Sequence, residues 1–590
     1  MKVKVSDYIF EYLKSKNITT AFSVSGGAAA HLLDSAKKSN IQYVANCHEQ
    51  ASAMAAEGYG RISPNPSLVL VTNGPGSSNT ITGIVGAYQD SIPVFVLSGQ
   101  VPRNQTVHTQ KDIRQLGIQE LDIIKIVDSI TKYSFQIQNP KDIKYHLDRA
   151  YHECTTGRKG PVWLDIPLDV QSALVETEDL IGLQPILPIY EEPNYQLILE
   201  LLSKAERPIV VTGNGIHLSK SEEEFKTLVG KLKIPCVSTW TSKDLFDWND
   251  PLFVGNFGLL GERAGNFAVQ KADLLLVLGS RLSVANVGYQ TKLFSPNSVK
   301  IMVDIDEGEL NKSTLNIDHK INANLLEFMP NLSRKIPANF PKRQSWIDEV
   351  KNWKDKYPVF LPEYKENTEK INSFYLMEVL SDNLEDDHVV VTDMGTSYTC
   401  THQSLKTNGK NRLFTSSGCC SMGFGLPGAI GTFYGDPSKR VVLIAGDGGF
   451  QMNIQELQTV VHNNIPLKIF ILNNNGYLAI SLMQDNLFDS NYVGSTNNSG
   501  VSSPDFTKIA KAYGIESVRF ANNKELESGI TRVLESEGPV LCEVVMPENQ
   551  PLIPRVQSRK DSSGEIVSTS IENMFPFLPK EELEAVMGKD

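Results

Sequence analysis

Gly446-Asp447-Gly448 and Asn473-Asn474 are the residues whose types and spacing point most directly to chemistry in this chain. Each group follows an apolar run of strand length, Val441–Ala445 in one case and Leu467–Leu472 in the other. Glycines at a strand end let backbone N–H groups approach a phosphate, and a helix beginning there directs its positive end at the anion. A carboxylate, an amide oxygen, a backbone carbonyl and phosphate oxygens supply most of an octahedral shell for Mg²⁺. The pattern therefore predicts a metal-diphosphate site, with a turn beside an Asn-rich loop as the plainer alternative.

Glu49 is a second candidate, because it follows an apolar strand-like run and lies in a helix-forming stretch rich in Ala and Met. A carboxylate in such a low-dielectric setting is a usual feature of functional sites. The alternative is an ordinary acidic residue in the first turn of a helix. His48 and His402 are candidates for acid-base groups, and structural histidines satisfied by their neighbours fit the sequence equally well.

The elements that must position these residues alternate along the whole chain, since apolar β-rich runs are followed by helical patterns from end to end. This alternation predicts an α/β fold of stacked domains with parallel sheets. Segments 172–194 and 335–367 are rich in Pro and charge and look like linkers. They divide the chain into a first domain (1–175), a central domain (190–335), a third domain (368–550) and a C-terminal tail (551–590).

Composition excludes several other classes of protein. The formal net charge of −12 provides no basic surface for nucleic acid or for an anionic membrane. We expect no signal peptide, and no apolar run approaches the roughly 20 residues that span a bilayer. Seven cysteines without CxxC spacing suit free thiols in a reducing compartment better than disulfides or zinc. We therefore expect a cytoplasmic protein that binds neither nucleic acid nor membranes.

The motifs above resemble the signature of the thiamine-diphosphate-dependent enzymes, GDG followed by NN at this separation, and the resemblance covers nearly the whole chain. It implies two thiamine-diphosphate-binding domains that flank a central Rossmann-like domain, the first binding the aminopyrimidine ring and the third the diphosphate. It also implies Mg²⁺ held by the side chains of Asp447 and Asn474 and by the carbonyl of Gly476. The cofactor contacts it implies are Glu49, Asn79, Thr396, Ser397, Cys420, Met422, Gly446, Gly448 and Gly449.

The same resemblance implies particular roles for three of these residues. Glu49, in the run HEQAS, would bond N1′ of the aminopyrimidine and activate the cofactor, which then carries out the difficult chemistry while the protein orients it. Met422, in the run CCSMGFGLPGA, would hold the cofactor bent, although a core-filling methionine is the commoner use of the residue. The carbonyl of Cys420 would meet the 4′-amino group, a role that needs no thiol chemistry.

Four further runs resemble the acetohydroxyacid (acetolactate) synthase group: SGGA at 25–28, TNGPG at 72–76, SGQVP at 98–102 and GIQE at 117–120. In that group they shape the donor side of the site, where a pyruvate-like 2-oxo acid loses CO₂. The resemblance implies Gly27 and Gln119 as catalytic residues there, and a surface glutamine is the alternative for Gln119. It also implies a homodimer, or a tetramer made of two dimers, with active sites at the subunit interface.

Two departures from that group concern the acceptor. The group carries RFDDR, whose last Arg grips the carboxylate of an acceptor 2-oxo acid, whereas this chain has Arg281–Ala285 (RLSVA). A Trp that shapes the acceptor pocket is replaced near Leu482-Met483. Because Ala cannot mimic a bidentate Arg–carboxylate pair, we expect an acceptor other than a second 2-oxo acid. The altered run also argues against FAD, and Gly213-Asn214-Gly215 lacks the third glycine of an NAD fingerprint.

The sequence therefore predicts thiamine-diphosphate- and Mg²⁺-dependent decarboxylation of a 2-oxo acid, pyruvate in the first place, with ligation of the acyl unit to a carbonyl acceptor. A keto sugar nucleotide is one candidate acceptor, for which segments 103–115 and 553–590 offer binding material. Acetolactate synthesis from pyruvate and a 2-oxo acid is one alternative. A catalytically silent nucleotide-binding paralogue is the other, and the intact Glu49, Asp447 and Asn474 argue against it.

Overall fold

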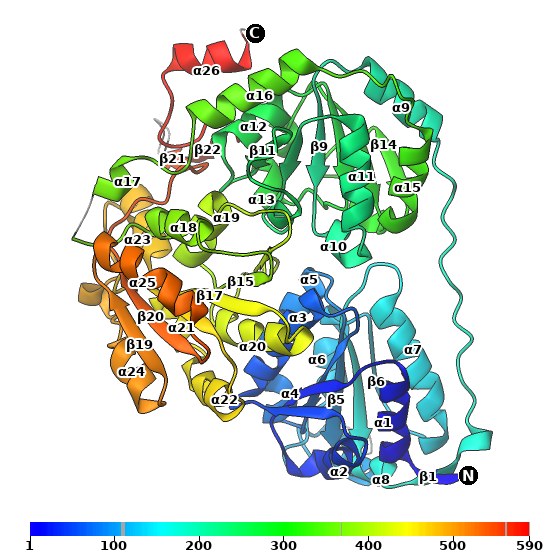
Figure 1. Cartoon of the computed structure of the whole chain (residues 1–590). Coiled ribbons are helices and arrows are strands. Elements are labelled where there is room, and N and C mark those ends of the chain that lie inside the picture. Colours follow the sequence, from blue (N-terminus) through cyan, green and yellow to red (C-terminus); the bar gives the residue numbers. More distant parts are fainter. Residues whose placement is uncertain (108–111, 367–368, 561–562, 564, 589–590) are drawn as a thin grey trace.

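The computed structural model describes residues 1–107, 112–366, 369–560, 563 and 565–588, which form three α/β units (Figure 1). Each unit is built on a six-stranded sheet in which all neighbouring strands run parallel. Strands such as β4 (Ser67–Val71) are buried along their whole length, as expected where helices cover both faces of a sheet. The predicted α/β fold is therefore confirmed. Parts of the predicted acceptor segments, at 108–111, 561–562, 564 and 589–590, lie outside the described residues.

The first unit has the strand order β3-β2-β4-β5-β7-β6, and an antiparallel pair of β1 with β8 ties its two ends together. Its strands are β1 (Lys2–Lys4), β2 (Thr20–Ser23), β3 (Gln42–Ala45), β4, β5 (Val94–Gln100), β6 (Tyr133–Gln136), β7 (Val162–Pro167) and β8 (Leu174–Glu176). Its helices are α1 (Val5–Ser15), α2 (Ala30–Lys38), α3 (Glu49–Ile62), α4 (Pro75–Asn79), α5 (Ile81–Gln89), α6 (Ile123–Val127), α7 (Ile143–Thr155) and α8 (Leu168–Gln171).

The central unit has the strand order β11-β10-β9-β12-β13-β14. Its strands are β9 (Pro208–Thr212), β10 (Cys236–Ser238), β11 (Phe253–Asn256), β12 (Leu274–Leu278), β13 (Val299–Asp304) and β14 (His319–Asn322). Its helices are α9 (Tyr195–Lys204), α10 (Gly215–Ser219), α11 (Glu222–Leu232), α12 (Arg263–Lys271), α13 (Val284–Val287), α14 (Glu307–Asn311), α15 (Leu325–Lys335) and α16 (Gln344–Lys356).

The third unit has the strand order β16-β15-β17-β18-β20-β19. Its strands are β15 (His388–Thr392), β16 (Arg412–Phe414), β17 (Arg440–Gly446), β18 (Lys468–Asn473), β19 (Glu516–Phe520) and β20 (Val540–Val545). Its helices are α17 (Glu363–Glu366), α18 (Ser373–Ser381), α19 (Thr396–Ser404), α20 (Gly425–Gly435), α21 (Asp447–Gln451), α22 (Leu457–His462), α23 (Leu478–Leu487), α24 (Phe506–Ala512) and α25 (Asn523–Glu535).

The strand orders confirm that two units of one kind flank a unit of another kind. When the strands of each sheet are numbered in chain order, both outer sheets read 2-1-3-4-6-5 and the central sheet reads 3-2-1-4-5-6. The latter is the order of a Rossmann fold. Within the described residues, no helix has the length and apolar character needed to cross a membrane.

The two segments predicted as linkers differ in structure. Residues 181–194 form neither helix nor strand and run along one side of the molecule from the first unit to the central one (Figure 1). Segment 335–367, by contrast, contains α16, so its description as a linker was wrong for that part. Trp346, Ile347, Val350 and Trp353 are buried on one face of this helix, and Trp353 packs against Phe267 of α12. The prediction of a linker relied on the proline and charged residues around this helix and overlooked its apolar face.

The C-terminal tail returns to the central unit. It contains the hairpin β21 (Ser558–Lys560) and β22 (Ile566–Ser568) and the helix α26 (Lys580–Met587), which lies beside α16 in Figure 1. Tyr357, just after α16, donates its hydroxyl to Glu582 of α26 at 2.7 Å. The tail is therefore part of the fold.

The first and third units meet where α3 crosses α20 at backbone distance. A Cβ added to Gly431 would overlap the carbonyl oxygen of Ala55, and one added to Gly58 would overlap that of Gly428. Only glycine allows such an approach, because any side chain at these positions would push the two helices apart. The crossing therefore sets the position of the first unit relative to the third.

We predict that Gly431→Ala lowers the thermal denaturation midpoint and loosens the contact between these units, because backbone must move to admit the methyl group. Such overpacking costs about 1–3 kcal/mol, or more where the backbone is fixed. Gly230→Ala is the matched control, since Gly230 lies in α11 with open space around it, and we expect it to stabilise by about 0.5–1 kcal/mol. Scanning calorimetry and limited proteolysis measure both effects, and equal behaviour of the two variants would contradict the prediction.

Candidate active site

Asp447 is the first residue of α21 and follows β17 directly. Its carboxylate accepts three hydrogen bonds, from the N–H of Gly448 at 2.8 Å, the N–H of Gly476 at 3.1 Å and the hydroxyl of Ser503 at 2.7 Å. Burial raises the pKa of this carboxyl above its ordinary value. A cation beside Asp447 would therefore stabilise its charged form.

Asn473 and Asn474 end β18, the neighbour of β17 in the sheet, but their amides differ in environment. The Asn473 amide donates to Glu543 at 2.6 Å and is satisfied by the protein. Asn474 is 5% exposed, and in the part of the chain that the structure describes its side chain has no hydrogen-bond partner. Neither polar atom of the Asn474 amide is among the fully buried unpartnered atoms of the described residues, so the amide is reachable and its hydrogen-bonding capacity is available to a ligand.

The donors at these two strand ends fit Mg²⁺, which prefers oxygen ligands. Three such groups lie on adjacent loops: the Asp447 carboxylate, the unpartnered Asn474 amide and the backbone of Gly476. Among the described residues, no group of three or more His, Cys, Asp or Glu side chains could hold a metal ion. A cation at Asp447 would therefore need oxygens from water or phosphate to complete its shell.

Thr396 and Ser397 begin α19, directly after β15, which is the other neighbour of β17. Both residues are buried, and the helix is preceded by Gly395 with a φ of 76°. Because β15 and β17 are neighbours in the sheet, the free backbone N–H groups at the start of α19 lie at the same edge of the sheet as the loop of Gly446. In α21, a Cβ on Gly448 would overlap the Tyr477 ring, and one on Gly449 would lie 2.7 Å from an Asp393 oxygen.

Asp393 organises the loop that carries Cys420 and Met422, a role that the sequence did not predict. It is fully buried and accepts the N–H groups of Met394 at 2.7 Å, Gly423 at 3.1 Å and Gly425 at 3.0 Å. Cys420, with a φ of 55°, and the half-buried Met422 therefore precede a fixed backbone segment. The sequence contained a signal for this role, because Asp393 follows an apolar run of strand length just as Asp447 does.

In the first unit, Glu49 and Asn79, both proposed as cofactor contacts, lie together. Glu49 is the first residue of α3 and is half-buried, and the Asn79 amide donates to its Oε2 at 3.0 Å. A Cβ on Gly76 would lie 3.8 Å from Glu49 Oε1, so the turn at 72–76 packs beside the carboxylate. This arrangement leaves Glu49 able to bond a polar ring atom of a ligand.

The same turn meets the two predicted donor-side residues. A Cβ on Gly74 would overlap the carbonyl of Gln119, and Thr72 Oγ1 accepts the N–H of Ala28, next to Gly27, at 3.2 Å. Gly27 and Gln119 are both exposed. Residues 116–120 are held by the buried Glu120, which ends the GIQE run but was given no role from the sequence, and which accepts the N–H of Leu116 at 2.8 Å.

The two groups of residues belong to different sheets. In the described part of the chain, no hydrogen bond or ion pair joins Glu49 to Asp447 or Asn474. Asn453, which follows α21 and was not predicted, links their surroundings, since its amide donates to Gln50 at 3.3 Å and to the Gly423 carbonyl at 2.8 Å.

Both histidines considered as acid-base groups have structural roles. His48 caps α3, and its Nδ1 accepts the N–H of Gln50 at 3.1 Å. His402 is buried in α19 with its Nδ1 2.8 Å from the carbonyl oxygen of Trp240. Burial lowers the pKa of His402 to about 4, so the ring is neutral near pH 7.

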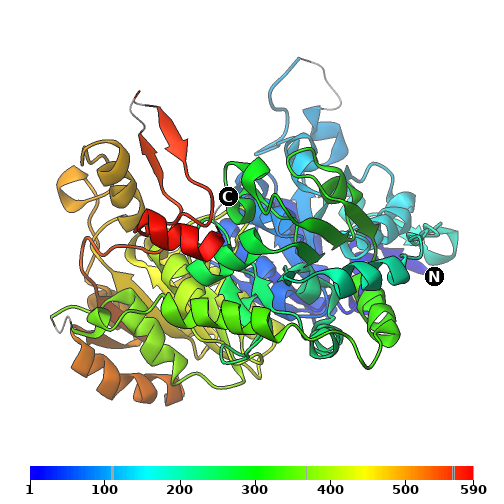
Figure 2. The same cartoon turned by 90° about the horizontal axis from the view of Figure 1, so that it is seen from above.

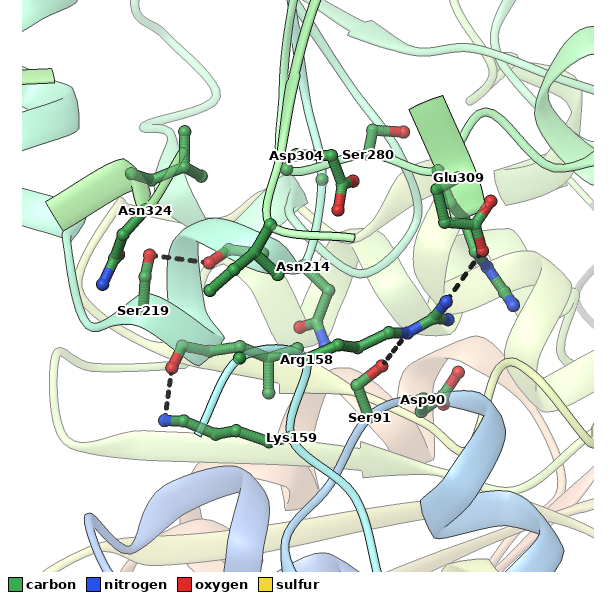
Figure 3. Close-up of a pocket in the computed structure, with 18 of the residues that line it drawn as sticks. Asp90, Ser91, Arg158, Lys159, Asn214, Ser219, Ser280, Asp304, Glu309 and Asn324 are labelled. Carbon is green, nitrogen blue, oxygen red and sulfur yellow. Dashed lines mark hydrogen bonds and ion pairs between the residues drawn. The ribbon is translucent and has the colours of Figure 1, made fainter. Parts of the chain in front are cut away.

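A separate cavity of about 510 Å³ lies at the carboxyl edge of the central sheet and is lined by all three units (Figure 3). Arg158 of the first unit reaches into it and pairs with Asp306 at 2.8 Å and Glu309 at 3.0 Å. Burial raises the pKa of Asp304 in its wall to about 6.

The glycines noted beside this cavity pack against backbone. A Cβ on Gly213 would overlap the carbonyl of Gly279, and one on Gly215 would lie 2.7 Å from the Gly279 Cα. Gly213 and Gly215 therefore allow their loop to pack closely against the loop of Gly279. This packing explains the two glycines without any dinucleotide-binding motif.

Comparisons with known proteins agree with this geometry. Three family models for thiamine pyrophosphate enzymes match the chain: the N-terminal TPP binding domain at residues 3–126, the central domain at 195–332 and the C-terminal TPP binding domain at 393–544. The acetolactate synthase large subunit of Cyanidium caldarium is 31% identical over 574 residues, 94% of this chain and 95% of that protein. The large subunit of Escherichia coli acetolactate synthase isozyme 2 is 30% identical over 553 residues, 93% of this chain and 97% of that protein.

Proposed function

The chain belongs to the thiamine pyrophosphate enzymes and is similar to acetolactate synthases, and we propose that it decarboxylates pyruvate and ligates the acyl unit to a carbonyl acceptor other than a second 2-oxo acid. The family makes it a thiamine-diphosphate-dependent decarboxylase or carboligase. The observation that carries the proposal is the donor set at adjacent strand ends, where the Asp447 carboxylate lies beside the unpartnered amide of Asn474.

The third unit would hold the diphosphate end of the cofactor. Asp447 and Asn474 would bind Mg²⁺ through their side chains and Gly476 through its carbonyl, with phosphate oxygens completing the shell. Thr396 and Ser397, at the start of α19, would donate to the diphosphate, as would the backbone of Gly446, Gly448 and Gly449.

The first unit would hold the aminopyrimidine. Glu49 would bond its N1′ and keep a proton there, while Asn79 orients the Glu49 carboxylate through the 3.0 Å hydrogen bond. When bound, thiamine diphosphate supplies the carbon nucleophile and the electron sink that decarboxylation requires. Met422 and the Cys420 carbonyl would fix the ring from the third unit, and Gly27 and Gln119 would border the donor.

We further propose a homodimer or a tetramer in which each site combines the first unit of one subunit with the third unit of its partner. The support is that Glu49 and Asp447 lie on different sheets with no bond between them among the described residues. Apolar side chains near the third-unit group are also exposed, Met452 at 48% and Met483 at 41%, as expected of a surface that another subunit covers. The seven unpaired thiols support a cytoplasmic location.

The proposed change of acceptor rests on Ala285, in the first turn of α13, where the acetolactate synthase group has an arginine. Acetolactate synthesis is the second candidate function and is favoured by identity over more than nine-tenths of the chain. A keto sugar nucleotide is a candidate acceptor because the tail adds an ordered hairpin near this region. The silent-paralogue alternative is opposed by Glu49, Asp447 and Asn474.

We also propose that the central cavity carries no flavin. Arg158, a cation that could meet a pyrophosphate there, is already neutralised by two carboxylates. An absorbance spectrum of the purified protein tests this, and a stoichiometric flavin band that survives gel filtration would overturn it.

Asp447→Ala should weaken metal-dependent binding of thiamine diphosphate by roughly 30-fold or more, because it removes a charged oxygen that faces the cation. Titration calorimetry with and without Mg²⁺ measures the loss. Asp382→Ala, which removes an exposed carboxylate from the same unit, is the control and should bind normally. Unchanged affinity in the Asp447 variant would rule out this metal site.

Glu49→Gln should leave cofactor binding intact but slow the exchange of the C2 hydrogen by roughly 100- to 10,000-fold, because an amide cannot hold the proton at N1′. Hydrogen–deuterium exchange followed by quenched-flow NMR measures the rate. Glu11→Gln, in the exposed part of α1, is the control. Exchange at the wild-type rate in the Glu49 variant would refute the role.

Pyruvate as the only substrate should be decarboxylated slowly and yield little acetolactate, while a keto sugar nucleotide should accelerate CO₂ release. The reason is that an acceptor carboxylate finds Ala285 in place of a guanidinium, and such a contact is worth about 2–5 kcal/mol. Product analysis with labelled pyruvate tests this. Acetolactate formation from pyruvate alone at about 10 s⁻¹ would instead establish the second candidate function.

A further inference from the structure

Arg555, in the tail, is a half-buried guanidinium without an anionic partner. Its Nε and Nη2 make only long contacts with the amide oxygen of Gln557, at 3.4 and 3.3 Å. In the described part of the chain no carboxylate lies within ion-pair distance of it, and burial lowers its pKa. A guanidinium offers five N–H donors, so most of its hydrogen-bonding capacity is unused.

Several other partly buried arginines of the protein are neutralised by carboxylates, whereas Arg263 and Arg343 have no carboxylate partner among the described residues and donate to backbone carbonyls instead. Arg61 pairs with Glu57 and Asp90, and Arg158 pairs with two carboxylates in the central cavity. Removing a cation from water without pairing it costs free energy, which a bound anion would recover. Arg555 therefore has the character of a binding group.

The backbone holds Arg555 beside the segment that contains Ala285. Arg555 and Phe575 exchange two backbone hydrogen bonds, at 3.0 and 2.7 Å, which fix the main chain. The N–H of Val556, the next residue, donates to the Leu259 carbonyl at 2.8 Å, and the N–H of Leu259 donates to the Ala285 carbonyl at 2.9 Å. One residue, Leu259, thus separates the tail from the position where the acetolactate synthase group supplies its acceptor arginine.

The same part of the tail contacts α23. This helix contains Leu482 and Met483, the second place where the sequence departs from the acetolactate synthase group in its acceptor region. Asn486 of α23 donates to the carbonyl of Ser558 at 2.8 Å and also accepts a hydrogen bond from Gln557, the residue that touches Arg555. Asn486 lies one helical turn after Leu482 and Met483, on the same side of α23. The tail, α13 and α23 therefore converge around Arg555.

We propose that Arg555 binds the anionic oxygen group of the acceptor, a carboxylate or a phosphate, and so takes over the charge that Ala285 lacks. The proposal rests on carboligation of the acyl unit to an acceptor, whether that acceptor carries a phosphate, as the proposed function expects, or a carboxylate, as the second candidate function requires. The hairpin β21–β22 that follows Arg555 projects from the same side of the molecule as the 103–107 segment of the first unit (Figure 2).

The test compares wild-type protein with Arg555→Ala and Arg555→Lys on three acceptors offered with pyruvate: acetaldehyde, which has no charge, 2-oxobutyrate, which has a carboxylate, and UDP-4-keto-6-deoxyglucose, which has a diphosphate. Arg555→Ala should lower kcat/KM roughly 30-fold or more for the charged acceptor that the enzyme uses, mainly through KM, and leave the acetaldehyde reaction unchanged. Arg555→Lys should recover part of the loss, because it restores the charge but not the bidentate geometry. CO₂ release with ferricyanide as oxidant should be the same in all variants.

Arg532→Ala, which removes an exposed guanidinium from α25, is the control for loss of charge, and melting curves establish that each variant is folded. A loss confined to the sugar nucleotide supports the proposal with a phosphate as ligand and agrees with the proposed acceptor. A loss confined to 2-oxobutyrate supports it with a carboxylate as ligand and replaces the proposed acceptor by a 2-oxo acid, as in the second candidate function. An equal loss with acetaldehyde, no loss with any acceptor, or a wild-type enzyme that does not favour either charged acceptor over acetaldehyde overturns it. A wild-type enzyme that releases no CO₂ from pyruvate would instead contradict the proposed function.

Discussion

The rest of the structure depends on the backbone contact between α3 and α20. Each helix leads to a functional segment, since α3 begins at Glu49 and α20 follows the loop of Met422. The glycines at the crossing allow one carbonyl to take the place of a side chain, so the distance between the helix axes has little freedom. Buried charges strengthen the same contact, because Arg61 of α3 is paired with Glu57 and Asp90, and Asp90 accepts the backbone N–H of Ser417 in the third unit at 2.7 Å. Burial raises the pKa of Glu57 to about 7, and a single guanidinium neutralises the cluster.

Strand order explains why each unit places its polar residues at one point. In an open parallel sheet, ligands bind outside the carboxyl ends of the strands, where the order reverses direction. In the third sheet this point lies between β15 and β17, which lead to Thr396 and Asp447. In the first sheet it lies between β2 and β4, which lead to Gly27 and the 72–76 turn. In the central sheet it lies between β9 and β12, where the 510 Å³ cavity opens beside Gly213 and Gly279. The two outer sheets and the differently ordered central sheet thus each place a candidate binding position where the strand order reverses.

Two of the candidate binding groups differ from the groups that hold the fold in how their hydrogen-bonding capacity is used. Asp393, Glu120 and the Arg61 cluster are buried and fully bonded to the protein, and they hold loops or units in place. The Asn474 amide and the half-buried Arg555 guanidinium have no comparable partners among the described residues. Both groups therefore keep hydrogen-bonding capacity that a ligand can use. Both lie where a cofactor or an acceptor is expected from independent features of the chain.

The sequence by itself determined the class of fold and most of the cofactor chemistry, because these depend on local patterns. An apolar run followed by Gly and Asp specifies a strand end with a carboxylate, and alternation of such runs with helices specifies parallel α/β units. The structure places Asp447 and Asn474 at the ends of adjacent strands and pairs Glu49 with Asn79, while their roles toward a cofactor remain proposals. Only the tertiary structure revealed the contacts of Asp393, Asn453 and Arg555 and the buried face of α16. Their contacts join residues far apart in the chain, as when Leu259 connects the tail to Ala285, and no local pattern encodes a contact between distant segments.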